Sequence, residues 1–245
     1  TIIPYFNCQT CSACEQGKPN CCEKIQVFGV HVDGGMREYI CVEDRFILPG
    51  NGLSADELAL VEPLAIAAHG LRRGQVQSGE KVLVMGAGPI GLFTILLAKI
   101  QGAQVEVAEP NAARLAFCIE KLGIPEATQA SYATVIDATG NRAAIESGFS
   151  KIAHGGQYIL IGLQKEAISF IHPEFHKREA TLMSSRNATV ADFRYVMDLF
   201  RTGQIDANDF ISHRFGWHEV AAIFPTIHLP EMGVRKGVIK LYAGR

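Results

Sequence analysis

The sequence lacks several features that would assign a protein to a class at once. No apolar run reaches the roughly 20 residues that a membrane-spanning helix needs. Lys and Arg form no cluster and the net charge is −2, which argues against nucleic acid as the main partner. No internal repeat or low-complexity tract is present. The 245 residues, 48% of them hydrophobic, suffice for one large domain or two ordinary ones.

The chain also lacks an initiator Met, because it begins Thr1-Ile-Ile-Pro. We therefore interpret it as a piece of a longer protein, for which a signal peptide is harder to exclude. The seven cysteines are an odd number, which suits thiols more than a disulfide framework. Reduced thiols predict an intracellular, cytoplasmic protein.

The strongest feature that is present is a cluster of cysteines near the start of the chain. Cys8, Cys11 and Cys14 occur at every third residue, and a turn of Gly, Pro and Asn then leads to Cys21 and Cys22. Four thiolates at this spacing suit tetrahedral Zn²⁺ and leave no open position for a substrate. Two disulfides could use the same residues only with strained, closely spaced partners. The spacing therefore predicts a structural zinc site, with either Cys21 or Cys22 as the fourth ligand.

A glycine-rich turn between a strand and a helix is the second strong feature. Lys81–Met85 is a β-branched, apolar run typical of a buried parallel strand, and Pro89–Gln101 has helical periodicity. The glycines between them permit a tight turn, an approach of the backbone to a pyrophosphate, and close packing of helix on strand. The pattern predicts a dinucleotide site formed by Gly86, Gly88, Pro89, Ile90 and Gly91.

An acidic residue favours NAD over NADP in this site. The predicted strand Gln104–Ala108 is followed by Glu109, eighteen residues after Gly91. A carboxylate there accepts hydrogen bonds from the ribose hydroxyls and repels a 2′-phosphate. Arg114 either lies against the adenine or caps a solvated helix face.

The rest of the chain alternates between predicted strands and helices. The predicted strands are Tyr132–Ala138, Gly156–Leu163, Ala180–Ser184 and Gly237–Tyr242. The predicted helices are Asn141–Ile152, Ala191–Thr202 and His218–Ile227. This alternation is typical of a doubly wound, Rossmann-type α/β fold with a parallel sheet.

One junction does not fit that fold. Only about ten residues separate Gly123 from the Tyr132 strand, whereas a crossover between parallel strands needs a dozen or more. Either the domain lacks one unit, or a segment has been left out near residues 129–132. We favour the omission.

Taken together, these features resemble the zinc-dependent medium-chain alcohol dehydrogenases, in the branch of the sorbitol, threonine and sugar-acid dehydrogenases. The resemblance covers essentially the whole chain. Besides the cysteines and glycines, it rests on Phe28–His31 and Gly34–Tyr39, which look like the strands that close the catalytic domain after the cysteine loop. It also rests on Leu60–Leu64, with His69 just beyond. It implies a Rossmann domain plus a GroES-like, β-rich catalytic domain whose N-terminal part precedes Thr1. It also implies the domain bounds 1–62 for the catalytic remainder, 63–186 for the NAD-binding domain, and 187–245 for the return to the catalytic domain.

The resemblance also implies roles for individual residues. It selects Cys22 as the fourth ligand of the structural zinc. It places Glu62 at or just behind a catalytic zinc, as a ligand or through water; the alternative is a helix-start acid beside Pro63. The other ligands of that zinc lie upstream of Thr1 in the family. His69 is better explained as a packed or capping residue than as a ligand. Further cofactor contacts are implied at Thr139, Gly140, Gly162, Leu163, Ser185 and Arg186.

The implied function is the zinc- and NAD-dependent oxidation of a secondary alcohol of a polyol or sugar acid to the ketone. Pro173–Glu179 and Arg186-Asn187 favour a sugar acid slightly, since guanidinium groups match carboxylates. The implied partners are a small-molecule substrate and a second or further copy of the chain, as a homodimer or homotetramer, with no nucleic acid and no membrane.

Two alternatives come from other classes. One is a non-catalytic, NAD-binding regulator that keeps only the structural zinc. The other is a zinc-ribbon module that binds nucleic acid through the cysteine loop. Lys18 and Lys24 are the only bases near that loop, and Glu15 and Glu23 offset them, so the second alternative lacks an electrostatic footprint.

Overall fold

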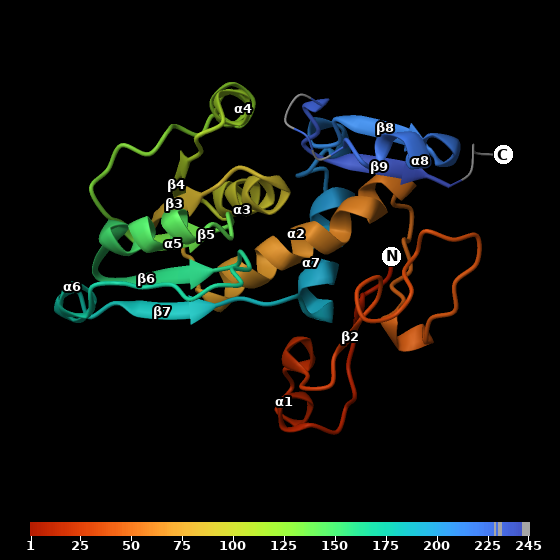
Figure 1. The fold of residues 1–245 in the computed structure, drawn as a ribbon, viewed down its shortest axis with the longest axis horizontal. Coiled ribbons are helices and arrows are strands. Elements are labelled where there is room, and N and C mark those ends of the chain that lie inside the picture. Colours follow the sequence, from red (N-terminus) through yellow and green to blue (C-terminus); the bar gives the residue numbers. More distant parts are fainter. Residues whose placement is uncertain (228, 230–231, 242–245) are drawn as a thin grey trace. The chain divides into compact units, whose positions relative to one another are not determined.

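The computed structural model of the chain describes residues 1–227, 229 and 232–241 (Figure 1). The chain forms two compact units. One unit comprises Thr1–Ala65 together with the segment that begins at Asn187, and the other is Ile66–Arg186. No described helix is both long and apolar enough to cross a membrane.

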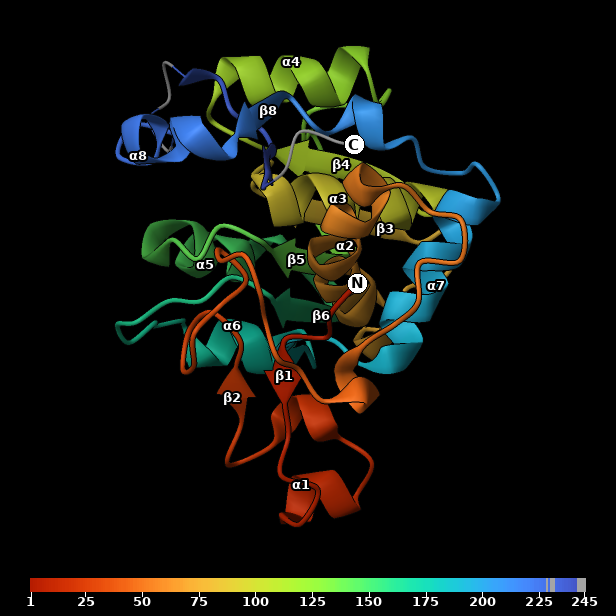
Figure 2. The same ribbon diagram turned by 90° about the vertical axis from the view of Figure 1, so that its right-hand side faces the viewer.

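The unit Ile66–Arg186 is built on a five-stranded parallel sheet in the order β4-β3-β5-β6-β7. Figure 2 shows its labelled strands pointing the same way. The strands are β3 (Lys81–Met85), β4 (Gln104–Ala108), β5 (Tyr132–Asp137), β6 (Ile152–Leu160) and β7 (Thr181–Ser184). The helices between them are α3 (Pro89–Ile100), α4 (Ala112–Glu120), α5 (Arg142–Gly148) and α6 (His172–Lys177). This architecture confirms the doubly wound α/β fold that the alternation predicts.

Burial explains why these strands lie inside the sheet. Val82, Leu83 and Val84 are at most 1% exposed, as are Val135 and Ile136 of the neighbouring strand. Strands buried on both faces read as continuous apolar runs, which is the pattern of the sequence here.

The strand β6 and helix α5 differ from their predicted bounds. β6 begins at Ile152, because Ile152 pairs with Tyr132 ahead of an irregularity in the register. It ends at Leu160, because the N–H groups of Ile161 and Gly162 turn to the Asp137 carbonyl. α5 ends at Gly148, and Phe149–Lys151 continues it only as a 3₁₀ turn.

The junction before β5 is closed by a carboxylate rather than by a crossover helix. Glu126 forms a parallel bridge with Val107 on the outer side of β4, and residues 127–131 alone lead from there to β5. Glu106 of β4 accepts hydrogen bonds from the Thr128 N–H at 2.7 Å and the Tyr132 hydroxyl at 2.7 Å. This network holds the short connection on the sheet, so the described chain lacks the crossover unit.

The other unit contains two two-stranded sheets and parts of several helices. Its strands are β1 (Tyr5–Phe6), β2 (Gln26–Val27), β8 (His213–Gly216) and β9 (Gly237–Lys240). Its helices are α1 (Ser12–Glu15), α7 (Val190–Arg201) and α8 (Val220–Ile223), and α2 (Ala55–Arg73) begins here and runs across the boundary of the units. Further 3₁₀ turns are Pro19–Cys21, Asp44–Phe46, Ala207–Asp209 and Trp217–Glu219.

Four expectations for this unit need correction. Within Phe28–Tyr39 the described residues form one β-bridge, that of Phe28 with Val32, and the Phe28 N–H also donates to the Pro4 carbonyl at 2.8 Å. The helix expected over His218–Ile227 shrinks to α8, which ends at Ile223, because Pro225 has no N–H with which to continue the helical hydrogen bonds. Glu62 is not at a helix start, because α2 begins at Ala55 and contains Pro63 in its interior. The final strand ends at Lys240, and Tyr242 lies outside the described residues.

Candidate functional site

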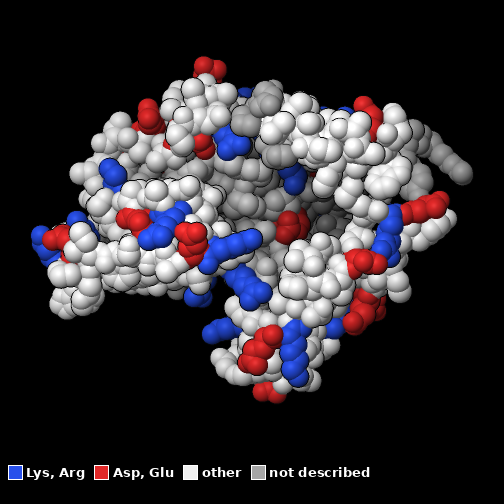
Figure 3. All heavy atoms as spheres, in the orientation of Figure 1, with Lys and Arg blue, Asp and Glu red and all other residues white. Residues whose placement is uncertain are grey.

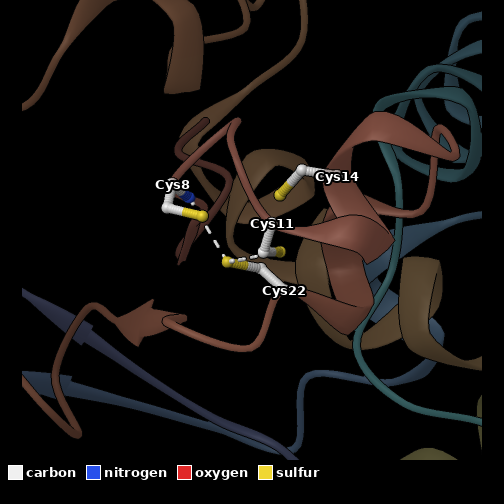
Figure 4. A group of neighbouring side chains, drawn as sticks. All are labelled: Cys8, Cys11, Cys14 and Cys22. Atoms are coloured by element: carbon white, nitrogen blue, oxygen red, sulfur yellow. Dashed lines mark hydrogen bonds between the residues drawn. The ribbon is translucent and has the colours of Figure 1, made fainter.

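Four cysteine side chains point toward one another at the end of β1 (Figure 4). Their sulfur atoms all lie within 4.8 Å of one another, and these cysteines are Cys8, Cys11, Cys14 and Cys22. The Sγ atoms of Cys11 and Cys22 are 3.9 Å apart. Sulfurs on a tetrahedral Zn²⁺ with bonds of about 2.3 Å would be about 3.8 Å apart, so the group fits zinc. Cys21 is exposed and does not belong to this group.

Hydrogen-bond donors surround the sulfur atoms. The Asn7 amide donates to Cys14 Sγ at 3.5 Å, and the Cys8 N–H donates to Cys22 Sγ at 3.3 Å. Hydrogen bonds from Thr10 lower the pKa of Cys8 to about 6, and the bond from Asn7 lowers the pKa of Cys14. Burial instead raises the pKa of Cys22 to about 11. Donors of this kind stabilise thiolates, which are the form that binds a metal.

The glycine-rich turn after β3 has the shape of a phosphate cradle. Gly86 has a φ of +92°, a conformation that favours glycine. A Cβ on Gly91 would lie 2.0 Å from the Gly86 carbonyl oxygen, so only glycine fits there. A Cβ on Gly88, in contrast, would meet nothing within 4 Å. The space beside Gly88 and the free N–H groups at the start of α3 are what a pyrophosphate needs.

The predicted cofactor residues lie together at the carboxyl edge of the sheet. They follow β3 (Gly86, Gly88, Pro89, Ile90 and Gly91), β4 (Glu109), β5 (Thr139 and Gly140), β6 (Gly162 and Leu163) and β7 (Ser185 and Arg186). A Cβ on Gly162 would lie 2.2 Å from the Gly140 nitrogen, and one on Gly86 would lie 2.8 Å from Thr139 Cγ2. The turns after β3, β5 and β6 therefore touch, at the point where the strand order reverses and where ligands of such sheets bind.

A buried aspartate fixes this edge, and the sequence analysis assigned it no role of its own. Asp137 is 0% exposed and accepts hydrogen bonds from the N–H groups of Thr139 at 3.1 Å and Gly140 at 3.2 Å. A carboxylate at the end of a strand expected to be buried was the available signal, because a buried charge needs partners.

Glu109 and Arg114 differ in how the fold holds them. Glu109 accepts hydrogen bonds from the N–H groups of Ala87 at 2.6 Å and Asn111 at 2.8 Å, so its carboxylate is fixed against the glycine-rich turn. Arg114 lies exposed in the first turn of α4, whose start is capped by Asn111. The structure therefore orients Glu109 at the site and leaves Arg114 on the helix surface.

Two neighbouring residues close the edge after β7. Ser185 is 7% exposed, and its hydroxyl has no hydrogen-bond partner among the described residues. A buried hydroxyl without a partner costs free energy unless a ligand supplies one. Arg186 and Leu163 are exposed. The orphaned Ser185 hydroxyl thus fits a polar group of a cofactor.

Glu62 lies in α2 beside a buried tyrosine. The Tyr5 hydroxyl donates a hydrogen bond to Glu62 Oε1, and the two residues are 57 positions apart in the sequence. Burial raises the pKa of Glu62, while the bond from Tyr5 and the charge of Lys236 act in the opposite direction. A carboxyl whose pKa is raised can carry a proton closer to neutral pH, which is useful at a reacting centre.

His69 and the charged segment around α6 have structural partners. His69 is buried in α2, and its Nδ1 lies 3.3 Å from the Arg72 guanidinium, as expected of a packed residue. Arg178 pairs with Glu174 at 2.8 Å and donates to the Ile152 carbonyl at 3.0 Å. On the face shown in Figure 3, acidic and basic side chains are interspersed and form no continuous basic track.

Comparisons with known proteins agree with this geometry. Residues 1–52 match the model of the alcohol dehydrogenase GroES-like domain, and residues 89–202 match that of the zinc-binding dehydrogenases. The chain is 42% identical over 253 positions to the L-galactonate-5-dehydrogenase of Escherichia coli K12, covering 97% of this chain and 74% of that protein. It is 31% identical to the 2-dehydro-3-deoxy-L-galactonate 5-dehydrogenase of Pseudoalteromonas atlantica, covering 86% of this chain and 66% of that protein.

A solved structure with NADH has the same fold. It is a short chain alcohol dehydrogenase from Escherichia coli CFT073, with a TM-score of 0.81 and 25% identity, covering 98% of this chain and 76% of that one. The alignment with the E. coli K12 relative is longer than the whole chain of 245 residues. That relative therefore has residues without a counterpart here.

Proposed function

Because the chain belongs to the zinc-dependent medium-chain alcohol dehydrogenase family, we propose that it oxidises a secondary alcohol of a sugar acid to the ketone with NAD. The observation that carries this proposal is the 42% identity to L-galactonate-5-dehydrogenase over 97% of the chain. A neutral polyol is the second choice of substrate. Cytoplasmic location and a homodimeric or homotetrameric state stay predictions.

The carboxyl edge of the parallel sheet would hold the NAD. The turn Gly86–Gly91 and the start of α3 would bind the pyrophosphate, and Glu109 would accept from the ribose hydroxyls. Gly162, Leu163 and Ser185 would bind the nicotinamide, for which Ser185 offers a buried hydroxyl. When bound, NAD accepts the hydride and a catalytic zinc polarises the alcohol oxygen.

The two metal roles would fall on different residues. Cys8, Cys11, Cys14 and Cys22 would hold a structural zinc with no open position. Glu62 would act at the catalytic zinc, as a ligand or through water. Its raised pKa also suits a residue that takes up the proton of the alcohol or passes it on.

A turnover assay on the purified protein tests this function. NAD⁺ is offered with L-galactonate, other sugar acids and neutral polyols, with and without a zinc chelator, while bound zinc is counted. We expect NADH formation that is fastest with a sugar acid and is lost on chelation. NAD⁺ binding without turnover on any secondary alcohol, at one zinc per chain, would identify a non-catalytic regulator instead.

Two glycine substitutions separate the cofactor site from the fold. Gly88→Ala places a methyl group where the structure has open space, so we expect an unchanged melting temperature and NAD binding weakened at least about tenfold. Gly91→Ala drives a methyl group into the Gly86 carbonyl, so we expect a folding defect. Unchanged NAD affinity in the Gly88 variant would place the pyrophosphate elsewhere.

A further inference from the structure

The strand β1 (Tyr5–Phe6) and the residue that follows it, Asn7, carry two side chains with polar partners. Tyr5 lies in the strand, and Asn7 lies between the strand and Cys8. Phe6 points to the other side of the strand from Tyr5 and packs on Phe28 and Phe46, with ring centroids 5.7 and 4.6 Å away. These aromatic contacts fix the orientation of the strand.

Asn7 connects the end of β1 to the cysteine cluster. Its amide nitrogen donates to Cys14 Sγ at 3.5 Å. The Arg45 guanidinium donates to the Asn7 side-chain oxygen at 3.3 Å and to the Asn7 carbonyl at 3.2 Å. Asn7 is thus held at both ends of its amide, and its orientation follows that of the cluster.

Tyr5 connects β1 to Glu62. The tyrosine is 5% exposed, and its ring packs edge-on against Phe193 with centroids 6.3 Å apart. Its hydroxyl is the one hydrogen-bond donor to Glu62 among the described residues. A free glutamate side chain loses rotamer entropy when it is fixed. A rigid, packed phenol that holds one oxygen removes that disorder before any ligand arrives.

We propose that Tyr5 is a positioning residue for Glu62, and that β1 makes the orientation of Glu62 depend on the cysteine cluster. The functional part of this inference rests on the proposed dehydrogenase activity. Tyr5 contacts neither cofactor nor substrate in this proposal. It fixes the carboxylate so that its second oxygen, Oε2, stays available to the reacting centre.

The kinetic test is a pair of substitutions on the full chain. Tyr5→Phe keeps the packed ring and removes the hydroxyl, so we expect kcat to fall about tenfold and KM to change less than twofold, since positioning acts on the reacting geometry. Glu62→Gln lowers kcat further, and the double variant should equal Glu62→Gln alone. If kcat of the double variant is about tenfold lower than kcat of Glu62→Gln, Tyr5 acts independently of Glu62 and the proposal fails.

The control variant is Tyr132→Phe. Tyr132 is also buried and also donates to a glutamate, Glu106, but it lies outside the site. Both variants lose a buried phenol hydroxyl, so we expect the unfolding midpoint to fall in both. We expect kcat to fall only in Tyr5→Phe, because only Tyr5 donates to Glu62. An equal loss of kcat in both would overturn the positioning role.

A second readout does not depend on turnover. With 3-fluorotyrosine in all tyrosines, the Tyr5 ¹⁹F signal is identified by its absence in Tyr5→Phe. We expect this signal to shift in Glu62→Gln, and to shift or broaden when zinc is extracted from the cysteines, while the Tyr132 signal stays in place. If the parent chain shows no turnover, the proposed function fails. The ¹⁹F shifts then decide by themselves whether Tyr5 is linked to Glu62 and to the cysteine cluster. A Tyr5 signal unmoved by either change would overturn the inference.

Discussion

Each of the two units contains a glutamate that accepts a hydrogen bond from a buried tyrosine. Glu106 accepts from Tyr132 and, in addition, from the Thr128 N–H at 2.7 Å and the Gln129 amide at 2.8 Å. Glu62 has Tyr5 as its one described donor. The two pairs thus share a motif and differ in how many donors the carboxylate receives.

The pKa values of the two glutamates shift in opposite directions. Burial disfavours the charged form of both glutamates, but the hydrogen bonds to Glu106 outweigh burial and lower its pKa to about 2. For Glu62 burial dominates and the pKa is raised. A carboxylate whose lone pairs are occupied by donors stabilises the fold, whereas one with a single donor is left able to bind a metal or a proton.

The largest expected effect is on activity, from Glu62→Gln. We expect kcat/KM with a sugar acid to fall about 100-fold, the upper range for loss of a group that tunes a metal site. The urea midpoint should hardly move, because Glu62 contributes one hydrogen bond. Steady-state kinetics check this, with Glu106→Gln as the control that keeps its activity. Full activity in Glu62→Gln would show that Glu62, like Glu106, has no role in catalysis.

The opposite result is expected for Glu106→Gln, whose effect is on stability. At pH 7 the free energy of unfolding should fall by about 2–3 kcal/mol, because several bonds to a charged acceptor are weakened. The folded pKa of about 2 lies below the ordinary value of 4.5, so this stabilisation is complete above about pH 4.5 and is lost as the pH falls toward 2. Urea unfolding at several pH values should show the gap to the parent chain closing over that interval. A gap independent of pH would contradict the charged state of Glu106.

A smaller effect is expected from Tyr132→Phe. Glu106 keeps its bonds from Thr128 and Gln129, so the free energy of unfolding should fall by only about 1 kcal/mol. Urea unfolding at pH 7 measures this value. A loss as large as that of Glu106→Gln would mean that Tyr132 carries the whole network.

The smallest expected effect comes from Gln9→Gly in the cysteine loop. Gln9 has a φ of +65°, a conformation that costs an L-residue about 1–2 kcal/mol and that glycine adopts freely. Part of this gain is offset, because glycine also increases the entropy of the unfolded chain. We expect a gain of about 0.5–1 kcal/mol in the zinc-loaded protein by urea unfolding, with kcat unchanged. A loss of stability would show that the Gln9 side chain has a role of its own.

Local patterns predicted much of this molecule correctly. The residues of β3 and β4 follow from short runs that are buried in the sheet, because such a strand needs no distant information to be recognised. The predicted bounds of β6 were wrong, since they depend on hydrogen bonds to the distant Asp137. The predicted length of α8 was wrong for a local reason, because Pro225 has no N–H to continue the helix. The strands predicted within Phe28–Tyr39 were also wrong, because a strand forms only where a neighbour pairs with it.

The sequence by itself determined the cysteine cluster, the glycine-rich turn and the alternation of strands and helices. Each of these depends on spacing within about 20 residues, which the covalent chain fixes. The spacing left Cys21 and Cys22 open and the family resemblance selected Cys22, which the tertiary structure brings into the cluster while Cys21 is exposed. Only the tertiary structure decided that Glu106 closes the junction before β5. It alone brought Tyr5 to Glu62, because hydrogen bonds between residues 57 positions apart depend on how the elements pack, which no local pattern encodes.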